Sequence, residues 1–352
     1  MRKKVFCVMV LYMGLFSSCD KEEIGFEEPI IPPIEEPENP SVIPSTNGLI
    51  RVKIDDDVMA IVGNGMWRSI CYGNGRYVAV GDSVRTESNG LNGRWGGATY
   101  SINGENWSTL ISLAKGFGVG AYIESVAYGN GKFVAVGNAD VNVNYARVTT
   151  STDGINWSDG NKLLPSTNVS SAIEIIFVDG KFYLLTSGEF LTSTNGVNWD
   201  KVSDGTAGSH SITYGNGVFV VGFDGSVGTS TDGGITWTIY KVNVIQNYNN
   251  KIHGVAYGNG QFTTVDENGC VNTSTDGVIW THATTIELPS SLDAFWCEWS
   301  RLRFIDGVFI AVGGSSYKEQ KMCAYSTNGV NWKFIDELTG DGFAYNDLCS
   351  VR

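Results

Sequence analysis

The chain has 352 residues, of which 42% are hydrophobic and only 17% are charged, with 44 glycines and a formal net charge of −13. A disordered or coiled-coil protein would be more highly charged, and the glycines follow no collagen-like period, so the composition is that of a globular protein with a core. The acidic balance argues against nucleic acid as a partner, because phosphate binding needs clustered lysine and arginine.

Residues 1–18 have the features of a signal peptide. Basic residues at positions 2–4 precede a short apolar run that ends in small residues before Cys19, and this run is too short for a membrane-spanning helix with its own flanks. The ending from Leu15 to Cys19 resembles a bacterial lipobox, which implies that Cys19 is lipidated; an ordinary secretory signal with an incidental cysteine is the alternative. We therefore expect the protein to contact a membrane only through an N-terminal lipid.

Residues 19–47 are predicted to form an extended stalk. Six of the eight prolines lie here, and the segment has several carboxylates but only one lysine. Proline-rich sequence whose negative charges repel one another stays extended and cannot build a core. The acidic tetrad at 20–23 resembles the signal by which some Gram-negative bacteria export lipoproteins to the cell surface. These resemblances imply an outer-membrane lipoprotein of the bacterial cell envelope that faces the outside, and they leave a periplasm-facing orientation open.

From residue 48 onward the sequence repeats. An aromatic residue, a turn rich in Gly with Asn or Asp, and a second aromatic five positions after the first occur six times, for example at 72–77 and 304–309. Apolar runs flank each glycine-containing turn, a pattern that predicts a β-hairpin.

The second half of each repeat has the pattern Ser-x-Asp/Asn-Gly-x-x-Trp. Its copies are spaced 38 to 52 residues apart, which is about the length of one four-stranded propeller blade. An Asp or Asn side chain can bond backbone N–H groups two residues on, glycine takes the left-handed conformation, and tryptophan packs on a neighbouring sheet. Because asparagine replaces aspartate in three copies, we expect a structural role for Asn103, Trp107, Asp153, Trp157, Asn195, Trp199, Asp232, Trp237, Asp276, Trp280, Asn328 and Trp332.

The repeats predict an all-β fold, a β-propeller of four-stranded blades over residues 48–352. Apolar stretches at 49–54 and 58–62, together with 343–352, could add a blade built from both termini. Such a blade would close the ring without an exposed edge, so we favour seven blades over six. The Asp-containing turns, such as residues 151–157, resemble the Asp-box or BNR repeat of sialidase-type propellers, photosystem II assembly-factor propellers and many secreted bacterial proteins. The resemblance covers roughly residues 66–337 and implies the fold rather than an activity.

The two faces of this propeller are expected to differ. Antiparallel order places the two tight turns of each blade on one face and all other connections on the opposite face. The long insertions belong to the second class and lie at 82–97, 138–147, 314–321, 111–122, 241–250 and 282–299. Binding sites usually lie in long, variable loops that a rigid scaffold holds in place.

Aromatic and charged residues in and beside these loops suit the C–H faces and hydroxyl groups of sugar rings. The candidate ligand-binding residues are Arg94, Trp95, Tyr145, Arg147, Tyr248, Trp296, Glu298 and Tyr317. The alternative is that each loop aromatic only packs against its own loop. By contrast, Trp67 and Trp299 each lie five residues before the first aromatic of a repeat and are predicted to share a packing position.

The resemblance to sialidases raises the possibility of an enzyme: sialidases combine three arginines, an acid/base carboxylate and a Tyr–Glu nucleophile pair with an Arg-Ile-Pro signature. That signature is absent, and nothing singles out three of the arginines at positions 68, 85, 94, 147, 301 and 303. No nucleophile-elbow, zinc-protease or phosphate-loop motif is present. We therefore expect a non-enzymatic binding module for a glycan or a protein partner. A sialidase-like glycoside hydrolase and an assembly factor similar to the photosystem propellers are the alternatives.

We expect a monomer without a cofactor or a metal site. The chain has only three histidines, so a histidine-built metal centre would need nearly all of them. The cysteines in strand-like sequence are predicted to be buried thiols, with a Cys71–Cys349 bridge across the ring closure as a further hypothesis.

Overall fold

A computed structural model of the chain describes residues 41–43, 49–54, 57–63, 67–86, 92–113, 122–138, 146–159, 161–162, 171–245 and 250–350. All of these belong to one compact unit, Pro37–Arg352. The predicted signal peptide and Cys19 lie outside the described residues, as do Tyr145 and Tyr248. In the described part, no helix has the length and hydropathy needed to cross a membrane.

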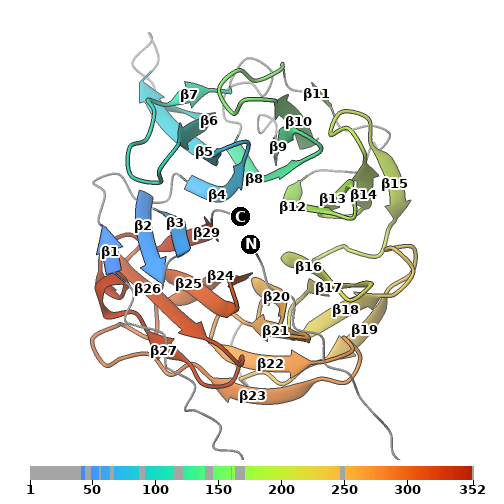
Figure 1. The fold of residues 1–352 in the computed structure, drawn as a ribbon. Coiled ribbons are helices and arrows are strands. Elements are labelled where there is room, and N and C mark those ends of the chain that lie inside the picture. The colour runs from blue at the N-terminus through green and yellow to red at the C-terminus, as the bar shows by residue number, and fades with distance from the viewer. Residues whose placement is uncertain are drawn as a thin grey trace, which may run out of the picture. The chain divides into compact units, whose positions relative to one another are not determined.

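The described residues form a ring of seven antiparallel sheets (Figure 1), which confirms the predicted all-β propeller of four-stranded blades. The first three repeat-bearing blades consist of β4 (Trp67–Gly73), β5 (Arg76–Thr86), β6 (Asn92–Ser101) and β7 (Ile111–Ser112); β8 (Tyr122–Gly129), β9 (Lys132–Asn138), β10 (Ala146–Ser151) and β11 (Asn161–Lys162); and β12 (Ala172–Val178), β13 (Lys181–Thr186), β14 (Phe190–Ser193) and β15 (Asp200–Ser203).

The next three blades follow the same order, with the first strand of each innermost in the ring (Figure 1). They consist of β16 (Ser211–Gly215), β17 (Val218–Gly222), β18 (Ser226–Ser230) and β19 (Thr238–Lys241); β20 (Gly254–Gly258), β21 (Gln261–Val265), β22 (Cys270–Ser274) and β23 (Thr281–Thr285); and β24 (Glu298–Ile305), β25 (Val308–Ser315), β26 (Gln320–Ser326) and β27 (Lys333–Phe334), with β28 (Gly340–Asp341) also paired to β26.

The remaining sheet closes the ring with strands from both ends of the unit. Its order is β1 (Ser41–Ile43), β2 (Leu49–Ile54), β3 (Asp57–Gly63) and β29 (Tyr345–Ser350). Figure 1 shows the red β29 beside the blue β3, with which it pairs. This is the closure favoured from the sequence, except that β1 lies within residues 19–47, which were predicted to be stalk. The run Ser-Val-Ile at β1 is rich in β-branched residues, which suits it to pairing.

The hairpin turn between the two innermost strands of a blade also packs against the neighbouring blade. At 258–261, Asn259 and Gly260 have φ values of 49° and 77°, as a two-residue hairpin turn with positive φ at both positions requires. The preceding Gly258 has a different role, because a Cβ there would lie 2.1 Å from the Phe304 ring of the next blade. The first glycine of the repeat therefore provides space for the aromatic ring of the adjacent blade.

The Asp-box side chains close the turn between the third and fourth strands. The carboxylate of Asp153 accepts hydrogen bonds from the N–H groups of Ile155 at 2.9 Å and Asn156 at 2.8 Å. The Asn103 amide oxygen accepts the equivalent pair of bonds at 3.0 Å each. Asparagine and aspartate thus build the same turn, and the charge is not needed for its geometry.

The apolar core lies between adjacent sheets. Trp157 of the second repeat packs against a cluster that contains Val78 and Val80 of the first, and its indole N–H donates to the Gly154 carbonyl at 3.2 Å. Trp67 and Trp299 are 6% and 2% exposed, as expected for the packing position that they share.

Two expectations from the sequence need correction. Most of the predicted loop at 82–97 is a continuation of the β5–β6 hairpin, in which Trp95 lies opposite Ser83, because the backbones of this polar stretch pair with each other. No disulfide joins Cys71 to Cys349, so the hypothetical bridge is not present in the structure.

Candidate functional site

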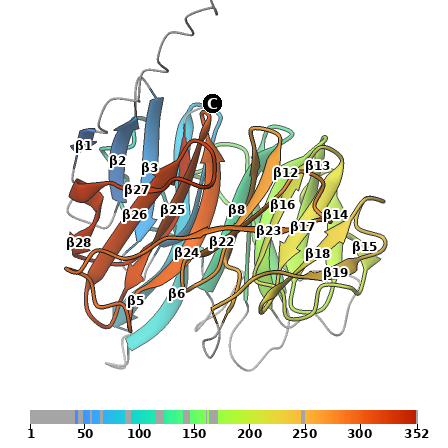
Figure 2. The ribbon, with the colours of Figure 1, turned by 90° about the horizontal axis from the view of Figure 1, so that it is seen from below.

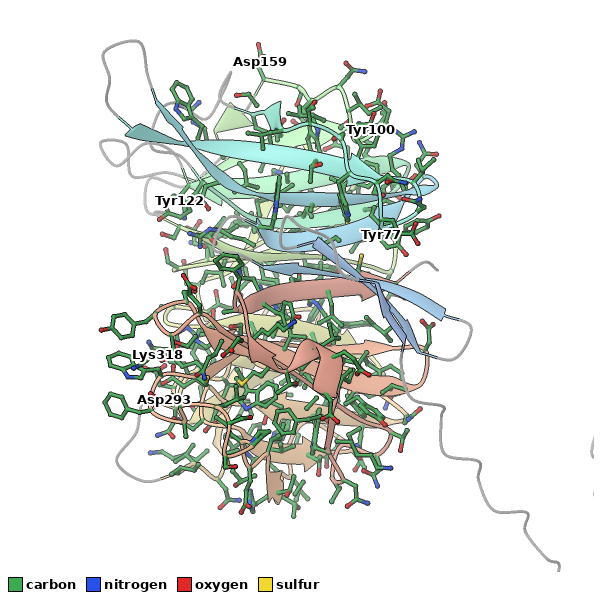
Figure 3. All side chains as sticks on the ribbon, turned by 90° about the vertical axis from the view of Figure 1, so that its left-hand side faces the viewer. Tyr77, Tyr100, Tyr122, Asp159, Asp293 and Lys318 are labelled. Carbon is green, nitrogen blue, oxygen red and sulfur yellow. The ribbon has the colours of Figure 1, made fainter. Side chains whose placement is uncertain are left out.

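The tight turns and the long connections lie on opposite sides of the ring. We call the side with the Asp-box turns and the innermost hairpin turns the Asp-box face, and the other side the loop face. Figure 2 shows the strands running between these two sides of the ring. Figure 3 shows Tyr122, Asp293 and Lys318 on the loop face and Tyr77 and Tyr100 toward the Asp-box face.

A cavity of about 590 Å³ opens at the channel mouth on the loop face. All seven innermost strands, or the residues directly before them, contribute to its lining. This channel-mouth cavity is lined by Arg68, Glu124, Ser171, Ala172, Ile173, Ser187, Ser209, His210, His253, Ser300, Arg301 and Asn346.

One position of the repeat supplies half of this lining. In each repeat, the residue four places before the first aromatic lines the cavity, and these residues are Arg68, Glu124, Ile173, His210, His253 and Ser300. In four of the six strands the pairing register shifts at this residue, for example between Trp67 and Ser69. A bulge changes the direction of the side chain that it contains, so the side chain at this repeat position points toward the channel.

On one side of the cavity, Arg68 is engaged by protein carboxylates. Its guanidinium lies 3.1 Å from Asp82 and 3.1 Å from Glu124, and it stacks over the Tyr122 ring at 4.9 Å. Burial raises the pKa of Glu124, and the nearby Arg68 only partly offsets this effect. Arg68 therefore lines the cavity with its charge compensated by carboxylates of the protein.

On the opposite side, two histidine rings lie together. The ring centroids of His210 and His253 are 5.0 Å apart, and His210 Nε2 is 2.7 Å from Asp224 Oδ1. Burial, with further contributions from His210 and Arg301, lowers the pKa of His253 to about 4. His253 is therefore neutral at physiological pH.

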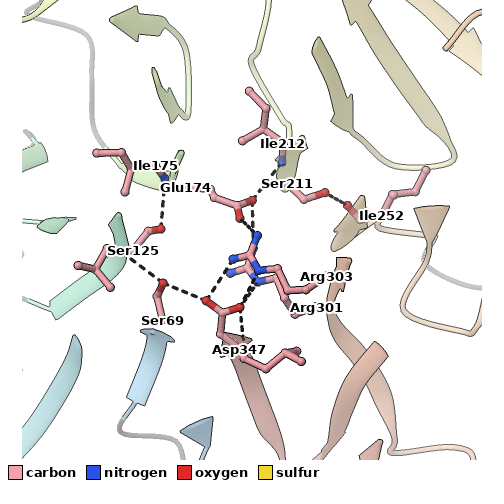
Figure 4. A network of polar contacts seen from close by, with 12 residues as sticks. Ser69, Ser125, Glu174, Ile175, Ser211, Ile212, Ile252, Arg301, Arg303 and Asp347 are labelled. Carbon is pink, nitrogen blue, oxygen red and sulfur yellow. Dashed lines mark hydrogen bonds and ion pairs between the residues drawn. The ribbon is translucent and has the colours of Figure 1, made fainter. Parts of the chain in front are cut away.

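Beneath the cavity, four charged side chains meet across the channel (Figure 4); we call Glu174, Arg301, Arg303 and Asp347 the ion-pair plug. Arg303 contacts Glu174 at 2.8 Å and Asp347 at 2.9 Å, and Arg301 contacts Glu174 at 3.1 Å. These residues come from β24, β12 and β29, so the plug joins three blades across the axis.

The carboxylates of the plug are held by the backbone as well as by the arginines. Asp347 accepts hydrogen bonds from the Ser69 hydroxyl at 3.0 Å and from its neighbour's N–H at 2.9 Å. Burial opposes ionisation of Asp347, but Arg303 and Arg301 outweigh it and hold its pKa below the usual value. Arg303 also lines a second cavity of about 830 Å³ toward the Asp-box face, so the plug lies between two separate cavities.

A second feature of the loop face is a group of exposed aromatic rings, which we call the aromatic patch: Phe295, Trp296 and Tyr317. These side chains are 79%, 42% and 74% exposed. The Trp296 ring lies 4.6 Å from Tyr317 and 5.0 Å from Phe295, measured between centroids. Beside the rings, Lys318 and Asp293 form a half-exposed ion pair at 3.6 Å.

The structure brings together only some of the eight candidate ligand-binding residues. Trp296 and Tyr317 are in contact, and Glu298 is exposed at the start of β24, two residues after Trp296. Trp95 and Arg147 are half-buried within β6 and β10. The backbone of Arg94 lies in β6, whereas its side chain, like Tyr145 and Tyr248, is outside the described part.

Most of the cavity lining, including Glu124, His210 and His253, is not among the residues predicted from the sequence. The available signal was the shared repeat position four residues before the aromatic. Among the described residues, no group of three or more His, Cys, Asp or Glu side chains could hold a metal ion. The arrangement offers a polar recess and exposed aromatic rings, which are features of binding.

No family model and no curated protein matches the chain. Among solved structures, YCF48 from Cyanidioschyzon merolae has a TM-score of 0.56 and 12% identity, covering 86% of this chain and 90% of that one. YCF48 bound to D1 peptide has a TM-score of 0.53 and 14% identity over 85% and 88%. A Hadza microbial sialidase has a TM-score of 0.46 and 12% identity over 76% and 71%. What the chain shares with YCF48 at these identities is the propeller fold.

Proposed function

We propose that this protein is a non-enzymatic binding module whose partner, a glycan or a protein, docks on the loop face. The channel-mouth cavity is the observation that supports this function most. It is a concave, polar recess on a rigid ring, and seven strands converge on it, as is typical of ligand sites.

The charges around the channel favour binding over hydrolysis. A sialidase-like site would need arginines free to grip a substrate carboxylate, but Arg68, Arg301 and Arg303 each contact carboxylates of the protein itself. A glycosidase also needs two carboxyl groups flanking an open space, whereas Glu124 and Glu174 are both engaged by arginine. A glycoside hydrolase is therefore the less supported alternative.

A second candidate is an assembly or scaffold role, in which a segment of a partner protein binds the loop face. The fold similarity to a YCF48 structure that contains a bound D1 peptide supports this candidate. For either role, the lipobox-like sequence before Cys19 supports attachment to the outer membrane, with the propeller carried on the acidic stalk.

The test is a glycan array probed with the full-length protein, with detection of released sugar on the same spots. We expect binding without release. Ser300→Phe would fill the channel-mouth cavity and weaken binding of any partner that enters it, whereas Ile305→Phe, on the same strand but in the cavity of the Asp-box face, would not. Release of sugar would contradict the non-enzymatic function.

A protein partner would be detected by crosslinking from introduced cysteines on the loop face and on the Asp-box face. Crosslinks confined to the loop face would support the assembly role. An array without binding, together with crosslinks on the Asp-box face alone or on neither face, would overturn the proposal.

A further inference from the structure

We propose that the aromatic patch is a platform for a neutral glycan, with one pyranose ring stacked on the exposed surface of the Tyr317 ring, which Trp296 supports from the other side. This inference rests on the proposed binding function and names the partner class. The patch does not belong to the lining of the channel-mouth cavity, so the two can be tested separately.

The patch aromatics are not needed to hold their own loop. Other groups anchor the segment between β23 and β24: Leu292 and Cys297 are buried at 7% and 6% exposure. The Asp293 carbonyl accepts hydrogen bonds from the N–H groups of Trp296 at 3.0 Å and Cys297 at 3.1 Å. Phe295 and Tyr317 instead expose about three quarters of their surface, which costs free energy unless a partner covers them.

The two segments that carry the rings are fastened to each other. The Asp293 N–H donates to Gln320 Oε1 at 3.0 Å, and Gln320 Nε2 donates to the Ser291 carbonyl at 3.4 Å. The β25–β26 turn is closed by a bond from the Lys318 N–H to the Ser315 hydroxyl at 3.1 Å. A platform built in this way is preorganised, so little ordering free energy is lost on binding.

The chemistry of the patch matches a pyranose ring. The planes of Trp296 and Tyr317 are inclined by 34°, whereas Phe295 meets Trp296 edge-on at 84°. Trp296 thus packs against Tyr317, and the exposed surface of the Tyr317 ring can accept the apolar C–H face of a sugar. The Lys318 ammonium lies over the Tyr317 ring, 5.6 Å from its centroid, and pairs with the Asp293 carboxylate at 3.6 Å. These two groups supply donors and acceptors for the hydroxyl groups of the sugar.

Charge and size together favour a neutral glycan. The chain has a net charge of −13, Asp293 compensates the charge of Lys318, and the exposed Glu298 lies two residues after Trp296, so sialylated or sulfated glycans would be disfavoured. A stable protein interface buries about 800 Å² on each partner around a buried core. Three rings on two adjacent loops make a smaller platform, which is enough for one or two sugar units.

The test uses the full-length protein and an array of neutral fragments of glucan, mannan, xylan, galactan and chitin, with sialylated and sulfated glycans beside them. Bound neutral fragments are then titrated by tryptophan fluorescence. We expect Trp296→Ala and Tyr317→Ala each to weaken binding about tenfold or more. Tyr317→Phe retains the ring and should bind nearly as well as the wild type.

Ile279→Ala is the matched control, because Ile279 is 73% exposed, as Tyr317 is 74% exposed, but lies in an Asp-box turn on the other face. It should leave binding unchanged, and thermal melts check that all variants fold. Binding only to anionic glycans, binding to none, or neutral binding unaffected by both alanine variants would overturn the inference. If Ser300→Phe abolishes neutral binding while the patch variants do not, the binding function survives and the patch is excluded as its site.

Discussion

The Asp-box face and the loop face of this propeller are built on different principles. On the Asp-box face, the same turns recur and bond from blade to blade: the Asn130 amide donates to the carbonyls of Gly180 and Thr194 in the next blade, both at 2.9 Å. On the loop face, one repeat position carries five different residue types in six blades, as with Arg68, Glu124 and His210. The repeated turns thus stabilise the ring on the Asp-box face, whereas the side chains on the loop face can vary without loss of these contacts.

The largest expected effect concerns the ion-pair plug, which lies between the faces. Asp347→Ala leaves Arg303 and Arg301 with an uncompensated charge in a buried site, and we expect a loss of about 3–5 kcal/mol in the free energy of unfolding. Chemical denaturation measures it. Lys318→Ala, which breaks the half-exposed pair with Asp293, is the control and should cost at most about 1 kcal/mol. Equal effects would mean that the plug does not stabilise the ring.

The interlocking glycines of the Asp-box face should show the next largest effect. In Gly258→Ala, the new methyl group would lie 2.1 Å from the Phe304 ring of the next blade, and we expect about 1–3 kcal/mol of destabilisation from overpacking. Gly260→Ala has open space around the methyl group but a φ of 77°, so it should cost only about 1 kcal/mol. Thermal melts of both variants give the comparison. If Gly260→Ala lowered the melting temperature more than Gly258→Ala, the packing of Phe304 onto Gly258 would not be the larger contribution to stability.

The difference between the two faces explains which features of the fold could be predicted from the sequence. The ring, the Asp-box turns and the closure by β29 follow from patterns that occur six times or from apolar strands at the two ends. The role of Gly258 could not be deduced, because the ring that it accommodates, Phe304, belongs to another repeat. A single repeat contains no information about which neighbour its glycine will face.

The candidate site was harder to predict for a related reason. Glu124 and His253 share a repeat position but have different chemistry, so no motif marks them. Trp95 was predicted in a loop, yet its strand continues through a polar stretch and pairs with Ser83. Trp296 and Tyr317 were identified as exposed loop aromatics, but their contact depends on two loops that are distant in the sequence.

The Asp-boxes predict a modest acid dependence on their face. The N–H of Asn156 lowers the pKa of Asp153, and the N–H of Ile279 lowers that of Asp276. Because the unfolded value is about 3.9, this stabilisation is present above that pH and is lost as the pH falls toward the lower folded values. Asp153→Asn with Asp276→Asn keeps the turn geometry but removes the charge, so the melting temperature at pH 7 should be lower than that of the wild type and should fall by fewer further degrees between pH 5 and pH 3. Asp341→Asn, exposed and outside the boxes, is the control, and parallel losses in both variants would exclude this account.

The smallest expected effect on stability lies in the aromatic patch. Tyr317→Ala removes a ring that is 74% exposed, so the free energy of unfolding should change by no more than about 0.5 kcal/mol. Tyr128→Ala, the contrasting change, removes a ring that packs onto Gly73 of the adjacent blade and should cost about 3 kcal/mol or more. Denaturant titrations of the two variants compare the faces directly. If Tyr317→Ala were as destabilising as Tyr128→Ala, the patch would be part of the scaffold, and its exposure would not be evidence for a binding role.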